Sequence, residues 1–195
     1  AYSVGVFPMA EHREDEEIFW VDPKRRGIFP IKDFHISRSL AKTLRQDRFE
    51  ISVNRAFAEV VEACADRAET WTNGQIFARY QDLHAMGHAH SLEVWQQGQL
   101  VGGVYGVSLG AGFFGESMFS RHRDASKVAL AYLMDRLRQA GFQLCDTQFL
   151  TPHLASLGAV EISRAAYKAR LQVAIKGEAD FDSPAIPGAQ MLLQR

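Results

Sequence analysis

Three polar side chains stand inside otherwise apolar stretches of this sequence: Glu116, Asp146 and Gln148. Glu116 interrupts the run 113–119, and the other two interrupt the run 142–149. A buried carboxylate is costly unless it is hydrogen-bonded or used in chemistry. One interpretation is that both acids cap backbone groups at strand ends. We favour a site for acid–base or acyl-transfer chemistry, because two acids fall independently at one topologically favoured place.

A sheet edge is expected to bring these residues together. Alternating and apolar patterns predict a three-strand meander followed by a helix that begins after Asp124, ends at Gly141 and leads into a further strand. A strand, a helix and a strand joined so closely form a right-handed crossover with parallel strands. Ligands bind at the carboxyl ends of such strands, beside the N-terminus of the crossover helix. The strands are expected at 90–95, 100–108, 113–119 and 142–148.

Strand periodicity then assigns faces. Side chains alternate along a strand, so Glu116, Met118 and Ser120 are expected to share one face. Asp146 and Gln148 are expected to share a face of the neighbouring strand for the same reason.

The remaining segments complete a mixed α/β (α+β) sheet covered by helices. Ser37 and Asn54 are of residue types that cap helices, and Gly87 suits the end of another. The tail after Lys176 is polar and contains proline, so we expect it to be loosely attached. Helices are expected at 37–45, 54–65, 73–87, 153–158 and 163–175, and short strands at 18–21 and 27–31.

Bulk properties exclude several classes of protein. The 195 residues are 47% apolar and 23% charged, which suits an ordinary globular domain. The net charge of −1 excludes a polycation, so any nucleic-acid contact must be local. No run of about 18 apolar residues occurs, so we expect no membrane span. Cys64 and Cys145 lie in apolar surroundings and indicate reduced thiols, hence a soluble cytoplasmic protein.

Two basic clusters could bind anions. Arg121, His122, Arg123 and Lys127 surround the start of the crossover helix, where backbone amides also favour an anion. The second cluster holds Arg38, Lys42 and Arg45 on one helical face. A solvated face is the alternative in both places, and contact with a nucleic-acid backbone is the functional interpretation of the second. The second cluster consists of Lys24, Arg25, Arg26, Lys32, Arg38, Lys42, Arg45 and Arg48.

Other motifs carry little weight. His84, His88 and His90 match no zinc motif, so we expect no metal and no cofactor. Ser117 lacks the G-x-S-x-G setting of a hydrolase nucleophile.

Long blocks of the chain resemble the bacterial leucyl/phenylalanyl-tRNA–protein transferases. The similarity runs in order over nearly the whole chain to about Leu171. The blocks are Ala1-Tyr2, Gly5–Pro8, His35–Leu40, Thr70-Trp71, Gly87–Trp95, Leu100–Val107, Phe114–Arg121, Ala125–Lys127, Asp146–Gln148 and His153–Ala159.

The resemblance implies an acyltransferase fold of the GNAT-like type. It divides the chain into a small N-terminal lobe (1–60) with a basic tRNA-facing helix, a GNAT-like catalytic domain (61–176) and the tail (177–195). It implies transfer of Leu, Phe and less readily Met from aminoacyl-tRNA to a protein with N-terminal Arg or Lys. The product is marked for degradation by the N-end rule, and the enzyme is expected to be a monomer that needs no membrane.

The resemblance also implies site roles. Gln148 would orient the attacking amine while Asp146 draws its proton through it, and Glu116 would hold the amino groups of the substrates. Trp71 and Ser120 would contact the tRNA 3′ end. The tRNA body would meet Arg38, Lys42, Arg45 and Arg48. The aminoacyl side chain would enter a pocket formed by Val104, Phe113, Met118, Leu130, Leu133 and Cys145.

Two other functions remain open. One is an acyl-CoA-dependent N-acetyltransferase of the same fold, although Ser120–Asp124 stands where its glycine-rich pyrophosphate loop would be. The other is a non-catalytic module that binds tRNA or a degradation signal.

Overall fold

A seven-stranded mixed sheet forms the centre of the computed structural model, which describes residues 1–10, 17–66 and 73–194. The strand order is β4-β5-β6-β7-β8-β3-β9, and a separate two-stranded sheet pairs β1 with β2. The strands are β1 (Phe7–Met9), β2 (Phe19–Val21), β3 (Arg25–Phe29), β4 (Glu50–Val53), β5 (Ala89–Gln96), β6 (Gln99–Leu109), β7 (Gly112–Ser120), β8 (Leu144–Gln148) and β9 (Val160–Ser163).

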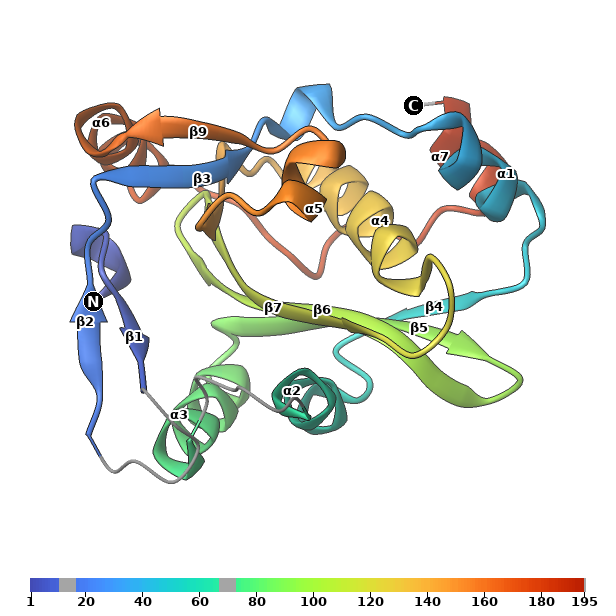
Figure 1. Cartoon of the computed structure of the whole chain (residues 1–195), viewed down its shortest axis with the longest axis horizontal. Coiled ribbons are helices and arrows are strands. Elements are labelled where there is room, and N and C mark those ends of the chain that lie inside the picture. The colour runs from blue at the N-terminus through green and yellow to red at the C-terminus, as the bar shows by residue number, and fades with distance from the viewer. Residues whose placement is uncertain (11–16, 67–72, 195) are drawn as a thin grey trace.

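Helices cover both faces of the main sheet (Figure 1). The mixed α/β class is therefore confirmed, and so is the meander β5-β6-β7. The helices are η1 (Tyr2–Val4), η2 (Ile31–Asp33), α1 (Arg38–Arg45), α2 (Phe57–Ala65), α3 (Gly74–Ala85), α4 (Ala125–Gln139), α5 (Pro152–Ser156), α6 (Arg164–Ala174) and α7 (Ala189–Gln194).

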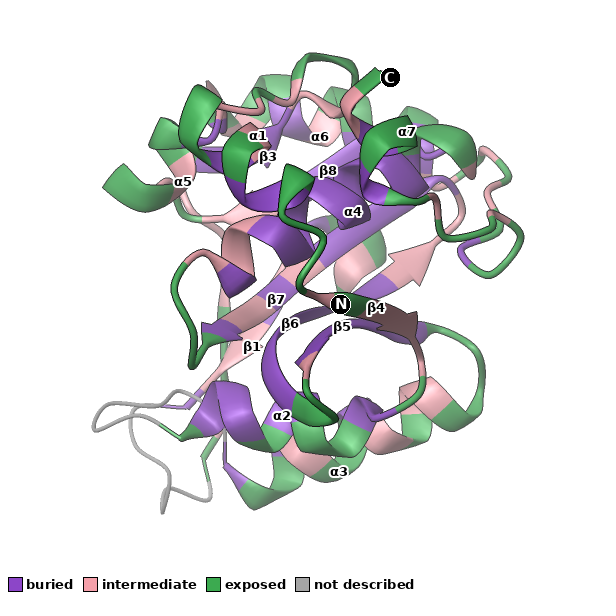
Figure 2. Ribbon diagram, turned by 90° about the vertical axis from the view of Figure 1, so that its right-hand side faces the viewer, coloured by how far each residue is buried: buried purple, intermediate pink, exposed green. Residues whose placement is uncertain are grey.

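Two hydrophobic cores lie on opposite faces of the sheet. The first packs the apolar side of α4 against the sheet, together with Leu40 and Leu44 of α1. The second packs α2 and α3 against the other face, and Tyr167 of α6 belongs to it. Figure 2 shows the buried residues of α4 and of the central strands between the exposed outer helices.

The expected crossover is present. α4 connects β7 to β8, and the two strands pair in parallel from Gly112↔Leu144 to Phe114↔Asp146. This pairing ends at Phe114 although β7 continues to Ser120 and β8 to Gln148. The strands therefore separate at their carboxyl ends, where a side chain or ligand can enter between them.

Both strands at this opening contain a bulge. In β7, Gly106 pairs with Gly115 and Tyr105 with Ser117, so Glu116 is an extra residue without a cross-strand partner. In β8, Thr147 is the extra residue opposite β3. A bulge re-aims the side chains that follow it, and such irregularities are common beside active sites. The expected face shared by Glu116 and Met118 is wrong for this reason: Glu116 contacts Tyr2 on the side of the second core, whereas Met118 packs against the first.

The segment before residue 61 shares the main sheet with the rest of the chain. β3 lies between β8 and β9, and β4 forms the opposite edge beside β5. The N-terminal lobe expected from the sequence is thus reduced to η1 and the small β1–β2 sheet, which stand beside the main sheet (Figure 1).

The segment after Lys176, expected to be loosely attached, is packed onto the first core. Phe181 and Leu192 are each only 3% exposed. The buried guanidinium of Arg136 in α4 donates hydrogen bonds to the carbonyl oxygens of Phe181 and Pro184 at 2.5 and 2.7 Å. The prediction was wrong because it rested on the polar composition of the segment, whereas a few apolar side chains and two hydrogen bonds attach it.

Helix caps follow expectation at α1 and differ at α2 and α4. The Ser37 hydroxyl accepts from the Leu40 amide at 3.2 Å, as expected. Asn54 does not cap α2, which begins after Ala56; its side chain instead accepts from the Ser91 amide and contacts His90.

Candidate active site

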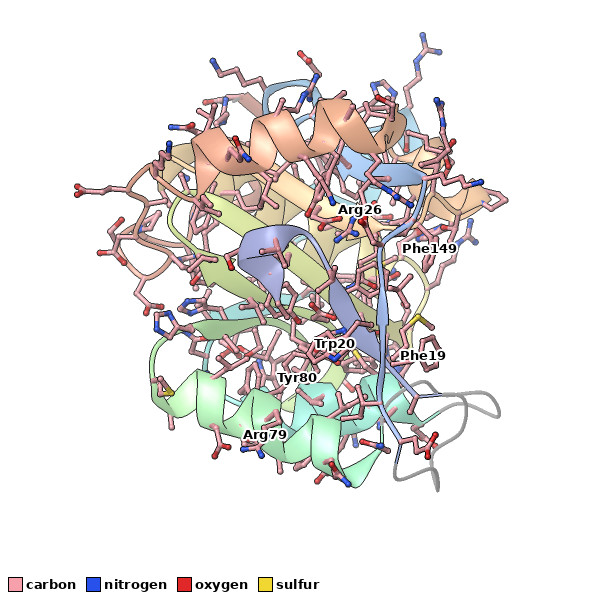
Figure 3. The ribbon with its side chains drawn as sticks, turned by 90° about the vertical axis from the view of Figure 1, so that its left-hand side faces the viewer. Phe19, Trp20, Arg26, Arg79, Tyr80 and Phe149 are labelled. Carbon is pink, nitrogen blue, oxygen red and sulfur yellow. The ribbon has the colours of Figure 1, made fainter. Side chains whose placement is uncertain are left out.

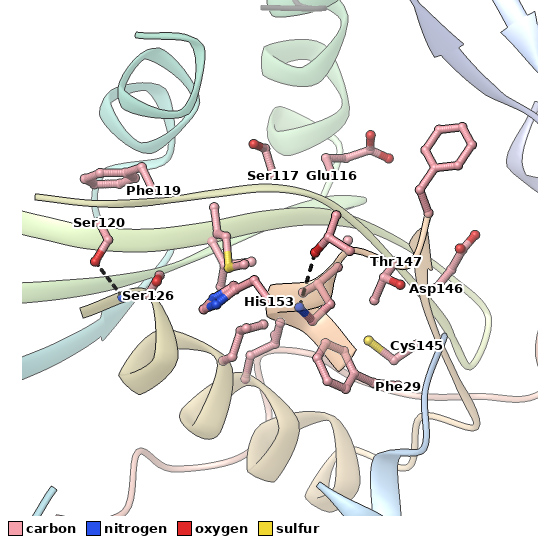
Figure 4. A pocket seen from close by; sticks show the side chains of 18 of the residues that line it. Phe29, Glu116, Ser117, Phe119, Ser120, Ser126, Cys145, Asp146, Thr147 and His153 are labelled. Atoms are coloured by element: carbon pink, nitrogen blue, oxygen red, sulfur yellow. Dashed lines mark hydrogen bonds between the residues drawn. The ribbon is translucent and has the colours of Figure 1, made fainter. Parts of the chain in front are cut away.

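A cavity of about 600 Å³ opens where β7 and β8 separate (Figure 4). Its walls come from β7, β8 and α4, and from the residues after β8. Volumes of this size accommodate small ligands and amino-acid side chains. Glu116 and Asp146 lie at one end of the cavity, and Ser126 at the start of α4 lies at the other (Figure 4).

Glu116 is held by neutral donors. The Tyr2 hydroxyl donates to its Oε1 at 2.6 Å, and the Gln148 Nε2 donates to its Oε2 at 2.9 Å. Tyr80 of α3 contributes a further hydrogen bond. Burial raises the pKa of Glu116 to about 7 because it disfavours the charged carboxylate, while these hydrogen bonds act in the opposite direction. Near neutral pH this carboxyl group can therefore both bind a cation and exchange a proton.

Gln148 connects the two acids. Its backbone adopts the left-handed conformation (φ 64°), and its amide N–H donates to Asp146 Oδ1 at 2.7 Å. The side-chain amide points the other way, to Glu116. The relay expected from the resemblance, in which Asp146 draws a proton through the Gln148 side chain, does not match these contacts.

Asp146 is fully buried and saturated with hydrogen bonds. Arg26 Nε lies 2.9 Å from Oδ1 and Arg26 Nη2 lies 2.6 Å from Oδ2. The Tyr167 hydroxyl also donates to Oδ2, at 2.6 Å. Arg26 is only 1% exposed, its guanidinium stacks on the rings of Phe7 and Tyr167, and Nη1 donates to the Gly5 carbonyl oxygen. Asp146 thus neutralises a buried cation.

This contact corrects the expected basic cluster. Arg26 was grouped with surface cations because its neighbours in sequence are Lys24 and Arg25. The alternation of β3 sends Arg25 to solvent, where it pairs with Glu161, and sends Arg26 inward.

Five of the six residues expected to form an apolar pocket line this cavity. Cys145 is buried there, and burial raises the pKa of its thiol, so it is a poor nucleophile. Phe29 of β3 joins this wall and was not foreseen. Phe113 does not line the cavity, because its ring stacks on Phe181 at 5.5 Å within the first core. The expected residues that do line it are Val104, Met118, Leu130, Leu133 and Cys145.

The rim beside α4 is built by Ser120. Its hydroxyl accepts from the Ser126 amide at 3.1 Å and thereby caps the start of α4. Asp124, the residue after which the sequence predicts the start of this helix, makes no capping bond and instead pairs with Lys127 at 3.0 Å. Ser120 and Arg121 both line the cavity.

The two basic clusters meet near this rim. Thr43 on the buried side of α1 donates to Asp124 at 3.2 Å, and Arg48 contacts the Arg123 carbonyl oxygen at 3.5 Å. The opposite side of α1 carries exposed cations. These are Arg38, Lys42 and Arg45, with Arg48 following.

Four residues contribute to the site although the sequence assigned them no role there. Tyr2, Tyr80, Arg26 and Tyr167 all come from outside the crossover. A weak signal existed for Tyr2, since Ala1-Tyr2 belongs to the blocks that carry the resemblance. Trp71, expected at the tRNA 3′ end, lies outside the described residues.

Two of the three histidines considered for a metal site, His84 and His90, make packing and hydrogen-bond contacts within the fold. His84 stacks on Phe57 at 4.1 Å, and His90 lies between Asn54 and Ser108. Within residues 1–10, 17–66 and 73–194, no group of three or more His, Cys, Asp or Glu side chains could hold a metal ion. In the same ranges, no helix is long and apolar enough to cross a membrane.

An ionisable carboxyl group with a raised pKa beside an apolar cavity is a candidate site for general acid–base chemistry on a bound ligand. The chain belongs to the leucyl/phenylalanyl-tRNA protein transferase family, whose main profile matches residues 28–172 and whose N-terminal domain matches residues 1–24. It is therefore an aminoacyltransferase, and the two alternative functions are not favoured.

Relatives with this family name are similar over most of their length. One from Ruegeria sp. (strain TM1040) is 70% identical over 100% of this chain and 93% of its own. One from Ruegeria pomeroyi is 63% identical over 100% and 92%. Among solved structures, the likeness to a ribosomal-protein-alanine N-acetyltransferase from Brucella melitensis is slighter: 16% identity, 47% of this chain, 72% of that chain and a TM-score of 0.35.

Proposed function

We propose that this enzyme transfers Leu or Phe, and less readily Met, from aminoacyl-tRNA to the N-terminal Arg or Lys of an acceptor protein. The observation that carries the proposal is the position of Glu116, an ionisable carboxyl group at the end of an apolar cavity large enough for these side chains. The product would carry a new N-terminal residue that marks it for N-end rule degradation. We expect the enzyme to act in the cytoplasm, where aminoacyl-tRNA is found, and to be a monomer.

The reaction needs no external energy because the aminoacyl ester is already activated. The acceptor's α-ammonium group loses one proton, and the resulting amine attacks the ester carbonyl. A C–N bond forms and the C–O bond to the tRNA 3′ ribose breaks. The second proton of the nitrogen passes to the departing ribose oxygen. The net products are a peptide bond, deacylated tRNA and one proton.

Glu116 is the best placed group to accept the first proton. Its pKa of about 7 lies close to that of an α-amino group, so transfer between them is nearly balanced. Gln148 uses Nε2 to hold Glu116, which leaves its amide oxygen as the acceptor for the ammonium group. We assign Asp146 the task of fixing Gln148 through its backbone amide.

The aminoacyl side chain would occupy the apolar wall. Met118 suits this wall because its flexible thioether adapts to branched, aromatic and thioether side chains. Val104 and Cys145 are smaller than a methionine or an aromatic residue and leave room for Phe.

The tRNA would lie across α1 and the start of α4. Thr43 and Arg48 contact the residues just before α4, so α1 lies next to the cavity rim. The exposed cations of α1 would therefore bind tRNA close to this rim. Charged side chains without base-edge contacts bind the phosphate backbone in a salt-dependent manner with little sequence preference.

A transfer assay tests the proposal. Labelled Leu-tRNA is incubated with the enzyme and a peptide that begins with Arg; label is expected in the peptide. The matched control is the same peptide with an acetylated N-terminus, which has no free amine. Absence of label, together with acetylation of the peptide from acetyl-CoA, would contradict the proposal.

A further inference from the structure

The Glu116 carboxylate is gripped from two sides by residues far apart in the sequence. Gln148 donates to Oε2 from β8, and Tyr2 donates to Oε1 from the helical turn η1. The Tyr2 hydroxyl also lies 3.2 Å from the Tyr80 hydroxyl of α3. With both oxygens engaged, the plane of the carboxyl group is fixed relative to the cavity.

The turn that carries Tyr2 is held in place by contacts with Phe114 and Arg26. The Tyr2 ring packs on Phe114 with centroids 4.9 Å apart. Gly5 ends the turn in the left-handed conformation, and its carbonyl oxygen accepts from Arg26 Nη1 at 3.0 Å. Arg26, which is labelled in Figure 3, is the same residue that donates hydrogen bonds to Asp146. One buried guanidinium therefore fixes the segment that positions Glu116 and the strand that positions Gln148.

The Tyr2 phenol is a protonated hydrogen-bond donor at neutral pH, because its pKa is raised. Burial raises its pKa well above 10, and the negative charge of Glu116 acts in the same direction. A neutral donor at 2.6 Å stabilises the carboxylate over the carboxylic acid. It thereby opposes the effect of burial, which alone would leave Glu116 protonated and unable to bind an ammonium group.

We infer that Tyr2 is a positioning residue of the transfer reaction: it holds Glu116 in the orientation and charge state that bind the acceptor's α-ammonium group. Tyr80 supports it from α3. This inference rests on the proposed function for its link to the acceptor, but the contact and its effect on Glu116 do not.

Replacing Tyr2 by Phe removes one partner of the Tyr80 hydroxyl but leaves the side chains of the other ionisable groups around Glu116 unchanged. Asp146 on β8 raises the pKa of Glu116, and Arg26 on β3 interacts with Glu116 in the opposite sense. Tyr105 on β6 acts on Tyr2 and Tyr80. None of them is altered by removing the Tyr2 hydroxyl.

Titration of the substrate-free enzyme tests the inference directly. Glutamate labelled with 13C at the carboxyl carbon reports Glu116, which is assigned with Glu116→Gln. We expect a midpoint near pH 7 in the parent enzyme and one higher by about one pH unit in Tyr2→Phe, the worth of one hydrogen bond to a charged group. Tyr132→Phe is the matched control, since Tyr132 is also buried but lies in α4 away from Glu116, and it should leave the midpoint unchanged.

Kinetics then separate positioning from a merely structural role. In Tyr2→Phe, the acceptor peptide's KM at pH 7 should rise roughly fivefold, because the ionised fraction of Glu116 falls by that factor when its midpoint rises by about one pH unit. The aminoacyl-tRNA KM should stay the same, and activity should recover at pH 8.5. A pH-independent loss, or an unshifted midpoint in the titration, would overturn the inference. If Tyr2→Phe does not fold, Tyr80→Phe takes its place, and a midpoint that does not rise would equally overturn it. A parent enzyme that titrates as expected but transfers nothing would refute the proposed function instead.

Discussion

The buried ion pair between Arg26 and Asp146 should contribute far more to stability than the exposed pair between Arg25 and Glu161. Replacing Arg26 by Met keeps the length of the side chain and removes the guanidinium. Asp146 would then remain in the interior with only the Tyr167 hydroxyl and the Gln148 amide as partners. The Gly5 carbonyl oxygen would lose its donor as well.

The size of the effect follows from burial. Arg26 and Asp146 are 1% and 0% exposed, so removing one partner leaves an uncompensated charge, which costs about 3–5 kcal/mol. Arg25 and Glu161 form the matched surface pair, with side chains 60% and 37% exposed. Arg25→Met should therefore cost at most about 1 kcal/mol.

Urea unfolding at pH 7.5 measures both variants against the parent enzyme. Equal m-values are required, because they show that the same surface is exposed on unfolding. In a thermal melt, the loss for Arg26→Met corresponds to roughly 6–20 °C, and that for Arg25→Met to at most about 4 °C. The double variant Arg26→Met/Asp146→Leu, which removes both charges, should recover much of the lost stability.

One result would refute this reasoning. If Arg26→Met and Arg25→Met differ by less than about 1 kcal/mol, Asp146 is not committed to Arg26. Asp146 would then be free to act as the proton acceptor, and the assignment of that task to Glu116 would fail.

Three further predictions concern the tRNA face, the cavity and the C-terminal segment. Replacing Arg38, Lys42 and Arg45 of α1 by alanine should weaken tRNA binding and lower the slope of log affinity against log salt concentration by about one unit per lost phosphate contact. Transfer from a minimal aminoacyl-adenosine should persist. An equal loss of transfer from aminoacyl-tRNA and from aminoacyl-adenosine would exclude the docking role. Val104→Phe should narrow the cavity and reduce kcat/KM for Phe-tRNA roughly tenfold more than for Leu-tRNA, whereas an equal reduction would place the side chain elsewhere. Phe181→Ala should cost about 3–5 kcal/mol in urea unfolding, against about 0.5 kcal/mol or less for the exposed Ile186→Ala; similar losses would mean that the segment is not packed.

The crossover could be predicted because its signals are local. The apolar periodicity of α4, the glycine that ends it and the two flanking apolar runs define it within 40 residues. The same pattern located Glu116 and Asp146 at the carboxyl ends of two parallel strands, as the structure shows. The residues of the apolar wall were implied by the family resemblance rather than by this local pattern, and of these Phe113 does not line the cavity.

The bulges could not be predicted. Strict alternation assigned Glu116 to the face of Met118, but one extra residue in β7 changes the parity beyond it. The position of a bulge depends on the register with the neighbouring strand, which local sequence does not encode. The sequence also did not single out the strand β4, because its alternating segment Glu50–Val53 is only four residues long.

The partners of the two acids were hidden by distance along the chain. Arg26 lies 120 residues from Asp146, and Tyr2 lies 114 residues from Glu116. Sequence alone counted Arg26 as a surface cation, because only the fold brings β3 beside β8. Which acid is neutralised and which is left with neutral donors is thus a property of the tertiary structure.

The account depends most on Glu116 as the group that binds and deprotonates the acceptor. The most direct measurement is single-turnover transfer from labelled Leu-tRNA to an Arg-initiated peptide between pH 5.5 and 8.5. For the parent enzyme, the rate should fall below a midpoint near pH 7, because protonation of Glu116 removes its charge. Glu116→Gln should bind Leu-tRNA normally, transfer at least about tenfold more slowly, and lose this acidic limb. Unchanged transfer by Glu116→Gln, with the same dependence on pH, would contradict the account.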